Sequence, residues 1–120
     1  MHTILVVDDD EDVLFLAATF LGDQGYNIMR ASSGAEGLSL LRSEPSIDLL
    51  LTDIVMPGDM DGFDLAWAGR NLRPDLRVLY TSGFPKSATE GKAGSNLGPM
   101  LPKPWRLRDL DAVVRRALDS

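Results

Sequence analysis

The chain has 120 residues, of which 44% are hydrophobic and 25% charged, a composition typical of one globular domain. Twelve basic and eighteen acidic residues give a net charge of −6, the wrong sign for binding nucleic acid or a membrane surface. Cysteine is absent, which excludes disulfides, thiolate metal sites and cysteine nucleophiles. The apolar runs are too short to span a bilayer and the N-terminus lacks a signal-peptide pattern, so we expect a cytoplasmic protein.

Strand and helix patterns alternate along the chain. Residues 4–7 form a continuous apolar run typical of a buried parallel strand, and apolar residues recur at helical spacing between residues 13 and 21. Further strands are predicted at residues 26–29, 47–52, 76–80 and 100–101, and helices begin near Ser33 and Phe63. A last helix covers residues 107–118. Glycines and prolines between residues 84 and 98 leave room only for a short or irregular fourth helix around residues 87–92.

This alternation predicts one α/β domain over residues 1–120, with a parallel sheet covered on both faces through right-handed crossovers. In doubly wound sheets, ligands bind beyond the carboxyl ends of the strands. Polar residues stand at four of these ends, and they are Asp8, Asp9, Asp53, Thr81, Ser82 and Lys103. We therefore expect three carboxylates, hydroxyl groups and one lysine to meet in a shallow pocket.

The predicted pocket has the chemistry of phosphoryl transfer. Three neighbouring carboxylates repel one another, so the pocket requires a cation, and hard carboxylate oxygens suit Mg²⁺. An ion held by Asp9 and Asp53 leaves coordination positions for phosphate oxygens, which a lysine and a hydroxyl also bind. A carboxylate can itself act as the nucleophile and form an aspartyl phosphate.

The motifs at the strand ends resemble those of response-regulator receiver domains, the phosphoacceptor modules of two-component signalling. They are Val6-Val7-Asp8-Asp9, Thr52-Asp53, Met56-Pro57, Met60-Asp61-Gly62, Ser82-Gly83 and Lys103-Pro104. The likeness covers the whole chain, and the order and separation of the motifs make it specific. It implies a flavodoxin-like domain of five β–α units with strand order 2-1-3-4-5. The pattern is most similar to stand-alone receivers and to those of hybrid histidine kinases.

The resemblance implies a role for each polar residue at the phosphoacceptor. Asp53 accepts the phosphoryl group from the phosphohistidine of a histidine kinase or a phosphotransfer protein. Ser82 hydrogen-bonds the new phosphoryl group, with Thr81 as the second choice for this hydroxyl. Lys103 pairs with the phosphoryl oxygens, and the bond from Lys103 to Pro104 is a candidate for the cis form.

The resemblance also implies a magnesium site and a slow loss of phosphate. Asp8 and Asp9, together with Asp53 and the backbone carbonyl of Val55, bind the Mg²⁺ ion. Val55 and Phe84 are both apolar and flank the route of a hydrolytic water, which neither side chain can orient. We expect slow autodephosphorylation, so the chain acts chiefly on itself and is not a conventional enzyme. Phosphorylation then switches the binding of an unknown downstream protein. We expect the chain itself to be a monomer or a weak dimer.

A degenerate receiver that only docks partners remains possible, although every core chemical position is present. Two functions of other classes also remain open from the residues alone. The first is a haloacid-dehalogenase-like phosphatase, because Asp8 and Asp10 imitate the nucleophile motif of such enzymes. Against it, Asp12 stands where that motif has threonine or valine, and the chain leaves no room for a cap domain. A flavodoxin-like FMN binder needs hydroxyls and amides in its first loop, where this chain has five consecutive acidic residues.

Overall fold

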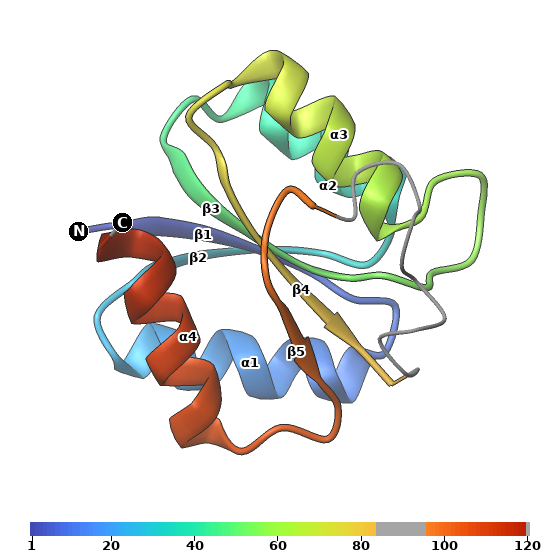
Figure 1. The fold of residues 1–120 in the computed structure, drawn as a ribbon. Coiled ribbons are helices and arrows are strands. Elements are labelled where there is room, and N and C mark those ends of the chain that lie inside the picture. Colours follow the sequence, from blue (N-terminus) through green and yellow to red (C-terminus); the bar gives the residue numbers. More distant parts are fainter. Residues whose placement is uncertain (84–95, 120) are drawn as a thin grey trace.

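The computed structural model describes residues 1–83 and 96–119 (Figure 1). The strands are β1 (Thr3–Val7), β2 (Asn27–Ala31), β3 (Ile47–Asp53), β4 (Arg77–Ser82) and β5 (Met100–Pro102). The helices are α1 (Glu11–Asp23), α2 (Gly34–Ser43), α3 (Gly62–Leu72) and α4 (Leu107–Asp119). The expected short helix around residues 87–92 lies outside the described residues.

The strands form a single parallel sheet in the order β2-β1-β3-β4-β5. This confirms the predicted doubly wound α/β class and the flavodoxin-like strand order. Helices α2 and α3 cover one face of the sheet, and α1 and α4 cover the other (Figure 1). None of the helices in the described part of the chain is both long and apolar enough to cross a membrane.

Side chains of β1 alternate between the two hydrophobic layers. Leu5 and Val7 pack in the layer beneath α2 and α3, whereas Ile4 and Val6 pack in the layer beneath α1 and α4. All four are buried, as expected for a central strand of a sheet with both faces covered. Because helices close both faces, the ends of the strands are where a ligand reaches the sheet.

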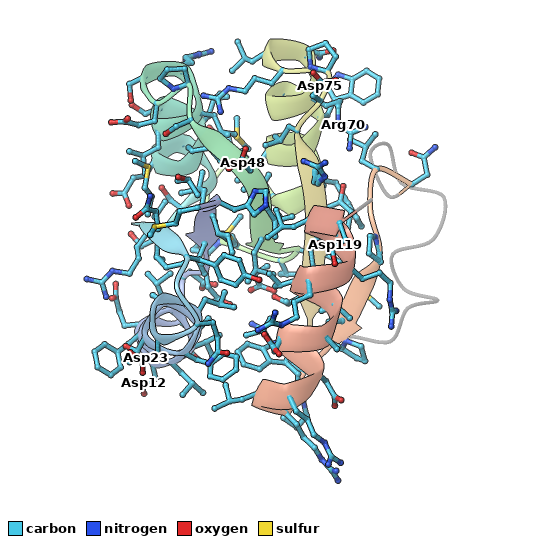
Figure 2. All side chains as sticks on the ribbon, turned by 90° about the vertical axis from the view of Figure 1, so that its left-hand side faces the viewer. Asp12, Asp23, Asp48, Arg70, Asp75 and Asp119 are labelled. Atoms are coloured by element: carbon cyan, nitrogen blue, oxygen red, sulfur yellow. The ribbon has the colours of Figure 1, made fainter. Side chains whose placement is uncertain are left out.

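One irregularity interrupts the pairing of β3 with β1. Thr3 pairs with Ile47, but the next residue, Ile4, pairs with Leu49, which leaves Asp48 as an extra residue in a β-bulge. The Asp48 carboxylate accepts a hydrogen bond from the Thr3 amide at 2.9 Å, so the amide keeps a partner despite the bulge. Figure 2 views the molecule from the side where β1 begins and shows Asp48 at that end of the sheet.

Arg73, directly after α3, connects three separate segments. Its guanidinium donates hydrogen bonds to the carbonyl oxygens of Leu41, Glu44 and Ile47. Leu41 lies in the last turn of α2, where carbonyls have no partner within the helix. Glu44 is the C-cap of α2, and Ile47 is the first residue of β3. One side chain therefore ties the end of α2 and the start of β3 to the end of α3.

Candidate functional site

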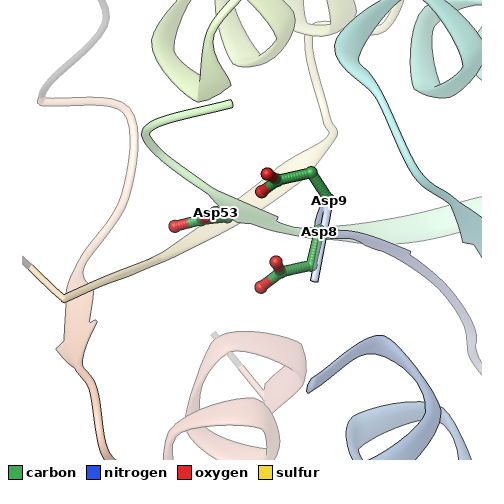
Figure 3. A group of neighbouring side chains, drawn as sticks. All are labelled: Asp8, Asp9 and Asp53. Carbon is green, nitrogen blue, oxygen red and sulfur yellow. The ribbon is translucent and has the colours of Figure 1, made fainter. Parts of the chain in front are cut away.

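Two neighbouring central strands end in aspartates. Asp8 follows β1 and Asp53 is the last residue of β3, and these strands pair up to Val7 and Thr52. Asp8, Asp9 and Asp53 each place one carboxylate oxygen within 4.8 Å of the others. Figure 3 shows the three carboxylates directed to the same side, beyond the strand ends. Asp8 and Asp53 are 2% and 8% exposed, whereas Asp9 is open to solvent, so the cluster forms a shallow site.

The acidic residues that follow β1 have two different roles. Asp10 is the N-cap of α1, and its side chain accepts hydrogen bonds from the amides of Asp12 and Val13. Asp8 lies on the other side of this turn, and its Oδ1 accepts the Asp10 amide at 2.9 Å. Helix capping therefore accounts for Asp10, while Asp8 and Asp9 belong to the carboxylate cluster.

The Asp53 carboxylate is held in an environment that disfavours its charge. Its Oδ1 accepts a hydrogen bond from the Ile54 amide at 2.9 Å. Burial raises the pKa of Asp53 from its ordinary 3.8 to about 6, and the negative charge of Asp8 adds to this rise. Lys103 and the amide hydrogen bond lower the pKa but offset only part of the increase. The groups around Asp53 therefore stabilise its ionised form only in part.

Lys103 reaches the cluster from the loop after β5. Its Nζ lies 2.8 Å from Asp8 Oδ2 and 3.5 Å from Asp53 Oδ1. Desolvation lowers the pKa of Lys103, but the hydrogen bond to Asp8 and the negative charges of Asp53 and Asp8 more than reverse this, so the net pKa is raised and the amine stays charged. The peptide bond from Lys103 to Pro104 is cis, as the sequence suggested.

The predicted hydroxyl residues lie at the same edge of the sheet. Thr81 pairs with Asp53 across β3 and β4, and both Thr81 and Ser82 are buried. The carbonyl of Ser82 accepts the backbone amide of Lys103 at 2.7 Å, which joins the end of β4 to the lysine loop. Val55, two residues beyond Asp53, is 49% exposed. The fold thus brings all seven predicted site residues to one end of the molecule.

The start of α3 belongs to the Met60-Asp61-Gly62 motif, but no role in the site was predicted for its residues from the sequence. Asp61 is the N-cap of α3 and forms a reciprocal capping box with Asp64. The next residue, Gly62, donates its amide to the carbonyl of Ile54 at 2.8 Å. The available signal for this cap was Asp61 followed three positions later by Asp64, at the start of an apolar helical pattern.

The carboxylate cluster fits a hard divalent cation. Carboxylate oxygens are the ligands that Mg²⁺ takes in proteins, usually from one or two carboxylates with water completing the octahedron. The oxygens of Asp8, Asp9 and Asp53 lie close enough together to share one ion. Burial, together with the negative charge of Asp8, disfavours the ionised form of Asp53, and a bound cation would stabilise that form.

Comparison with known proteins gives the same class as the fold and the site. The family model of the response regulator receiver domain matches residues 4–115, so the chain belongs to the response regulator receiver family. It is 35% identical over 119 residues to the response regulator receiver protein CpdR of Brucella abortus, covering 98% of each chain. It is 32% identical to part of the sensor kinase CckA of the same species, covering 98% of this chain and 13% of the kinase.

Solved structures show the same relationship. A response regulator receiver protein from Sinorhizobium medicae superposes with a TM-score of 0.91 at 29% identity, covering 99% of this chain and 95% of that one. The receiver domain of the hybrid histidine kinase CckA gives a TM-score of 0.82 at 32% identity, with coverage of 97% and 98%. The chain is thus a receiver with a phosphoacceptor role in two-component signalling. These comparisons lend no support to a haloacid-dehalogenase-like phosphatase.

Proposed function

We propose that residues 1–120 form one receiver domain in which Asp53 accepts a phosphoryl group from a phosphohistidine in a reaction that requires Mg²⁺. The donor is a histidine kinase or a histidine phosphotransfer protein. The observation that carries this proposal is the convergence of Asp53 with two further carboxylates and the Lys103 amine at the ends of separate strands. Phosphorylation then changes the affinity of the domain for a downstream protein.

The chemical step is an in-line displacement at phosphorus. A carboxylate oxygen of Asp53 forms the new bond to phosphorus while the bond from phosphorus to the donor imidazole nitrogen breaks. The imidazole leaves with the electron pair of that bond. The Ile54 amide, at 2.9 Å from Oδ1, orients the carboxylate for this attack.

Positive charge and hydrogen bonds at the site stabilise the transferred group. Lys103 stays charged and its Nζ lies within 3.5 Å of Asp53, so it pairs with the oxygens of the phosphoryl group. The hydroxyl of Ser82 donates a hydrogen bond to one of these oxygens, and Thr81 is the alternative donor. Burial of both residues excludes water that would compete for these contacts.

Asp8, Asp9 and Asp53 would hold the divalent cation, with the backbone carbonyl of Val55 as a further ligand. When bound, the ion supplies positive charge that offsets the carboxylates and orients phosphate oxygens. The three carboxylates match this task because two are buried and one is exposed, which leaves the ion accessible to the donor.

The donor protein needs a surface beside this site, and the structure has an apolar groove there. The groove has a volume of about 420 Å³ and is lined by Val13, Leu16, Gly83, Lys103, Pro104 and Trp105. Leu16 is 48% exposed, and its neighbour Phe15 is 64% exposed. Because Lys103 belongs to both the groove and the site, a partner helix seated in the groove brings its histidine near Asp53. We therefore assign the groove to the phosphodonor protein.

Incubation with Mg²⁺ and acetyl phosphate, followed by intact mass spectrometry, tests the assignment of Asp53. The wild-type chain should gain one phosphoryl group, and the gain should disappear on chelation and in Asp53→Asn. Asp59→Asn, an exposed aspartate in the following loop, is the matched control and should be phosphorylated normally. Persistent labelling of Asp53→Asn would show that another residue is the phosphoacceptor.

Transfer from a protein donor tests the groove separately. Leu16→Arg should slow transfer from a phosphorylated histidine phosphotransfer protein while leaving the reaction with acetyl phosphate unchanged. Leu72→Arg is the control, because Leu72 is similarly exposed at 47% but lies on α3. Equal transfer rates for wild type and Leu16→Arg, across a panel of such donors, would exclude the groove as the docking surface.

A further inference from the structure

The first residue of α3 lies against the backbone of the phosphoacceptor. Gly62 is buried, and a Cβ atom at this position would overlap the backbone oxygen of Asp53 and lie 2.8 Å from Ile54 Cα. Both atoms belong to the main chain, so no side-chain rotation can make room for the added carbon. Only glycine fits here without a shift of the backbone.

Ile54 links Gly62 to the reactive carboxylate. The Ile54 amide donates to Asp53 Oδ1 at 2.9 Å and to the Thr81 carbonyl at 3.0 Å. The Ile54 carbonyl accepts the Gly62 amide at 2.8 Å. This second hydrogen bond fixes the peptide group that joins Ile54 to Val55, and the next carbonyl along the chain is the one assigned above to the cation.

The packing around α3 indicates which part of the chain adjusts if an atom is added at Gly62. Phe63, Leu65 and Ala66 follow Gly62 and are buried in the core, so the start of the helix is anchored. In the loop between β3 and α3, by contrast, Val55 and Pro57 are exposed. An atom added at Gly62 therefore presses on the buried main chain of Asp53 and Ile54, and the exposed loop that follows them is the part free to adjust.

On these grounds we propose that Gly62 is a positioning residue of the phosphoacceptor site. Its close approach to the main chain sets the orientation of the Asp53 carboxylate and of the Val55 carbonyl. This inference rests on the proposed function, since it concerns how the same site binds its cation and presents its nucleophile. Groups that orient metal ligands without touching the metal commonly change metal affinity by about 10- to 100-fold when replaced.

Gly62→Ala tests the proposal, and Gly69→Ala in the same helix is its matched control. A Cβ at Gly69 meets only the side-chain ends of Leu41 and Leu76, each at 2.9 Å, and these can shift. Both variants should lose some thermal stability. Only Gly62→Ala should also bind Mg²⁺ about tenfold more weakly by titration, and it should react more slowly with acetyl phosphate even at saturating Mg²⁺. Wild-type affinity and rate in Gly62→Ala, or equal losses in both variants, would overturn the proposal.

A second measurement needs no variant and serves if Gly62→Ala does not fold. In a Mg²⁺ titration of the wild-type chain followed by amide NMR, the resonance of Gly62 should shift together with that of Asp53, while that of Gly69 stays in place. A Gly62 resonance that remains fixed while Asp53 shifts overturns the inference alone. Absence of any Mg²⁺ response and of phosphorylation in the wild type refutes the proposed function itself.

Discussion

Lys103 lies closer to Asp8 than to Asp53: its Nζ is 2.8 Å from Asp8 Oδ2 and 3.5 Å from Asp53 Oδ1. Asp8 is the more buried of the two carboxylates, and Lys103 is its ion-pair partner. A cation that takes Asp8 as a ligand competes for the same oxygen atoms. The lysine is then available to the oxygens around Asp53, where a phosphoryl group would be bound.

Lys103→Met should destabilise the cation-free protein more than the Mg²⁺-bound protein. Without the amine, the buried Asp8 carboxylate loses its ion pair with Lys103. We expect a loss of about 2 kcal/mol, which is less than for a fully buried pair because the lysine is partly exposed. Urea unfolding with chelator and with Mg²⁺ measures both losses. Arg115→Met, which breaks the exposed pair with Asp111, should change little in either condition. Equal losses for Lys103→Met in both conditions would contradict the competition for Asp8.

The raised pKa of Asp53 makes the stability of the cation-free protein depend on pH. The folded protein binds this proton more tightly than the unfolded chain, with pKa values of about 6 and 3.8. The stabilisation is therefore fully present below pH 3.8 and is lost as pH rises through about 6. The shift corresponds to at most about 3 kcal/mol. Asp53→Asn removes this titration, so it should gain stability relative to wild type as the pH increases.

Urea unfolding of both proteins in chelator, at about pH 4.5 and about pH 7.5, measures this difference. Comparing the two proteins cancels the titration of the acidic residues that lie far from Asp53. A difference in the free energy of unfolding that stays constant between these pH values would show that Asp53 titrates normally in the fold.

Binding of Mg²⁺ should stabilise the fold through the carboxylate cluster. At ten times its dissociation constant, the ion should raise the free energy of unfolding by about 1.4 kcal/mol. Asp9→Ala should remove most of this gain at the same Mg²⁺ concentration. Asp12→Ala is the control, because Asp12 is an equally exposed acid that lies outside the cluster. A full gain in Asp9→Ala would exclude Asp9 as a ligand.

The lifetime of the phosphorylated state should depend on Val55. This side chain is exposed beside the site and is apolar, so it cannot orient a hydrolytic water. We expect Val55→Asn to dephosphorylate several-fold faster than wild type, because an amide can hold that water, and Val55→Ala to stay slow. Decay of the phosphoprotein after removal of the donor is followed by intact mass. Phe84, the second position named for this effect, lies outside the described residues.

The regular elements and the location of the site could be predicted because they follow from local patterns. Apolar runs and helical spacing place the strands and helices to within about two residues, the usual error of element ends. The rule that ligands bind at the carboxyl ends of parallel strands then brings Asp8, Asp53 and Lys103 together. The helix predicted to begin near Ser33 does so, with Ser33 as the N-cap of α2, and the Glu36 side chain accepts the amide of Ser32.

Features that depend on contacts distant in sequence could not be predicted. The bulge at Asp48 is accompanied by a hydrogen bond to Thr3, 45 residues away, and no local pattern marks it. Lys103 lies closer to Asp8 than to Asp53 because of the distances between the loops that follow different strands. The packing of those strands sets these distances. The close approach of Gly62 to Asp53 likewise depends on how α3 docks, and a glycine in a turn-rich segment suggests only a turn.

The three hydrogen bonds of Arg73 have a consequence for variants of this protein in cells. They lie at the end of the molecule away from Asp53, so a variant such as Arg73→Ala should be phosphorylated at the normal rate per folded molecule. Fewer molecules would be folded at any moment, and proteolysis would remove the rest. Damage there would therefore appear as reduced abundance and a weaker signalling output, although the chemistry of each surviving copy is intact.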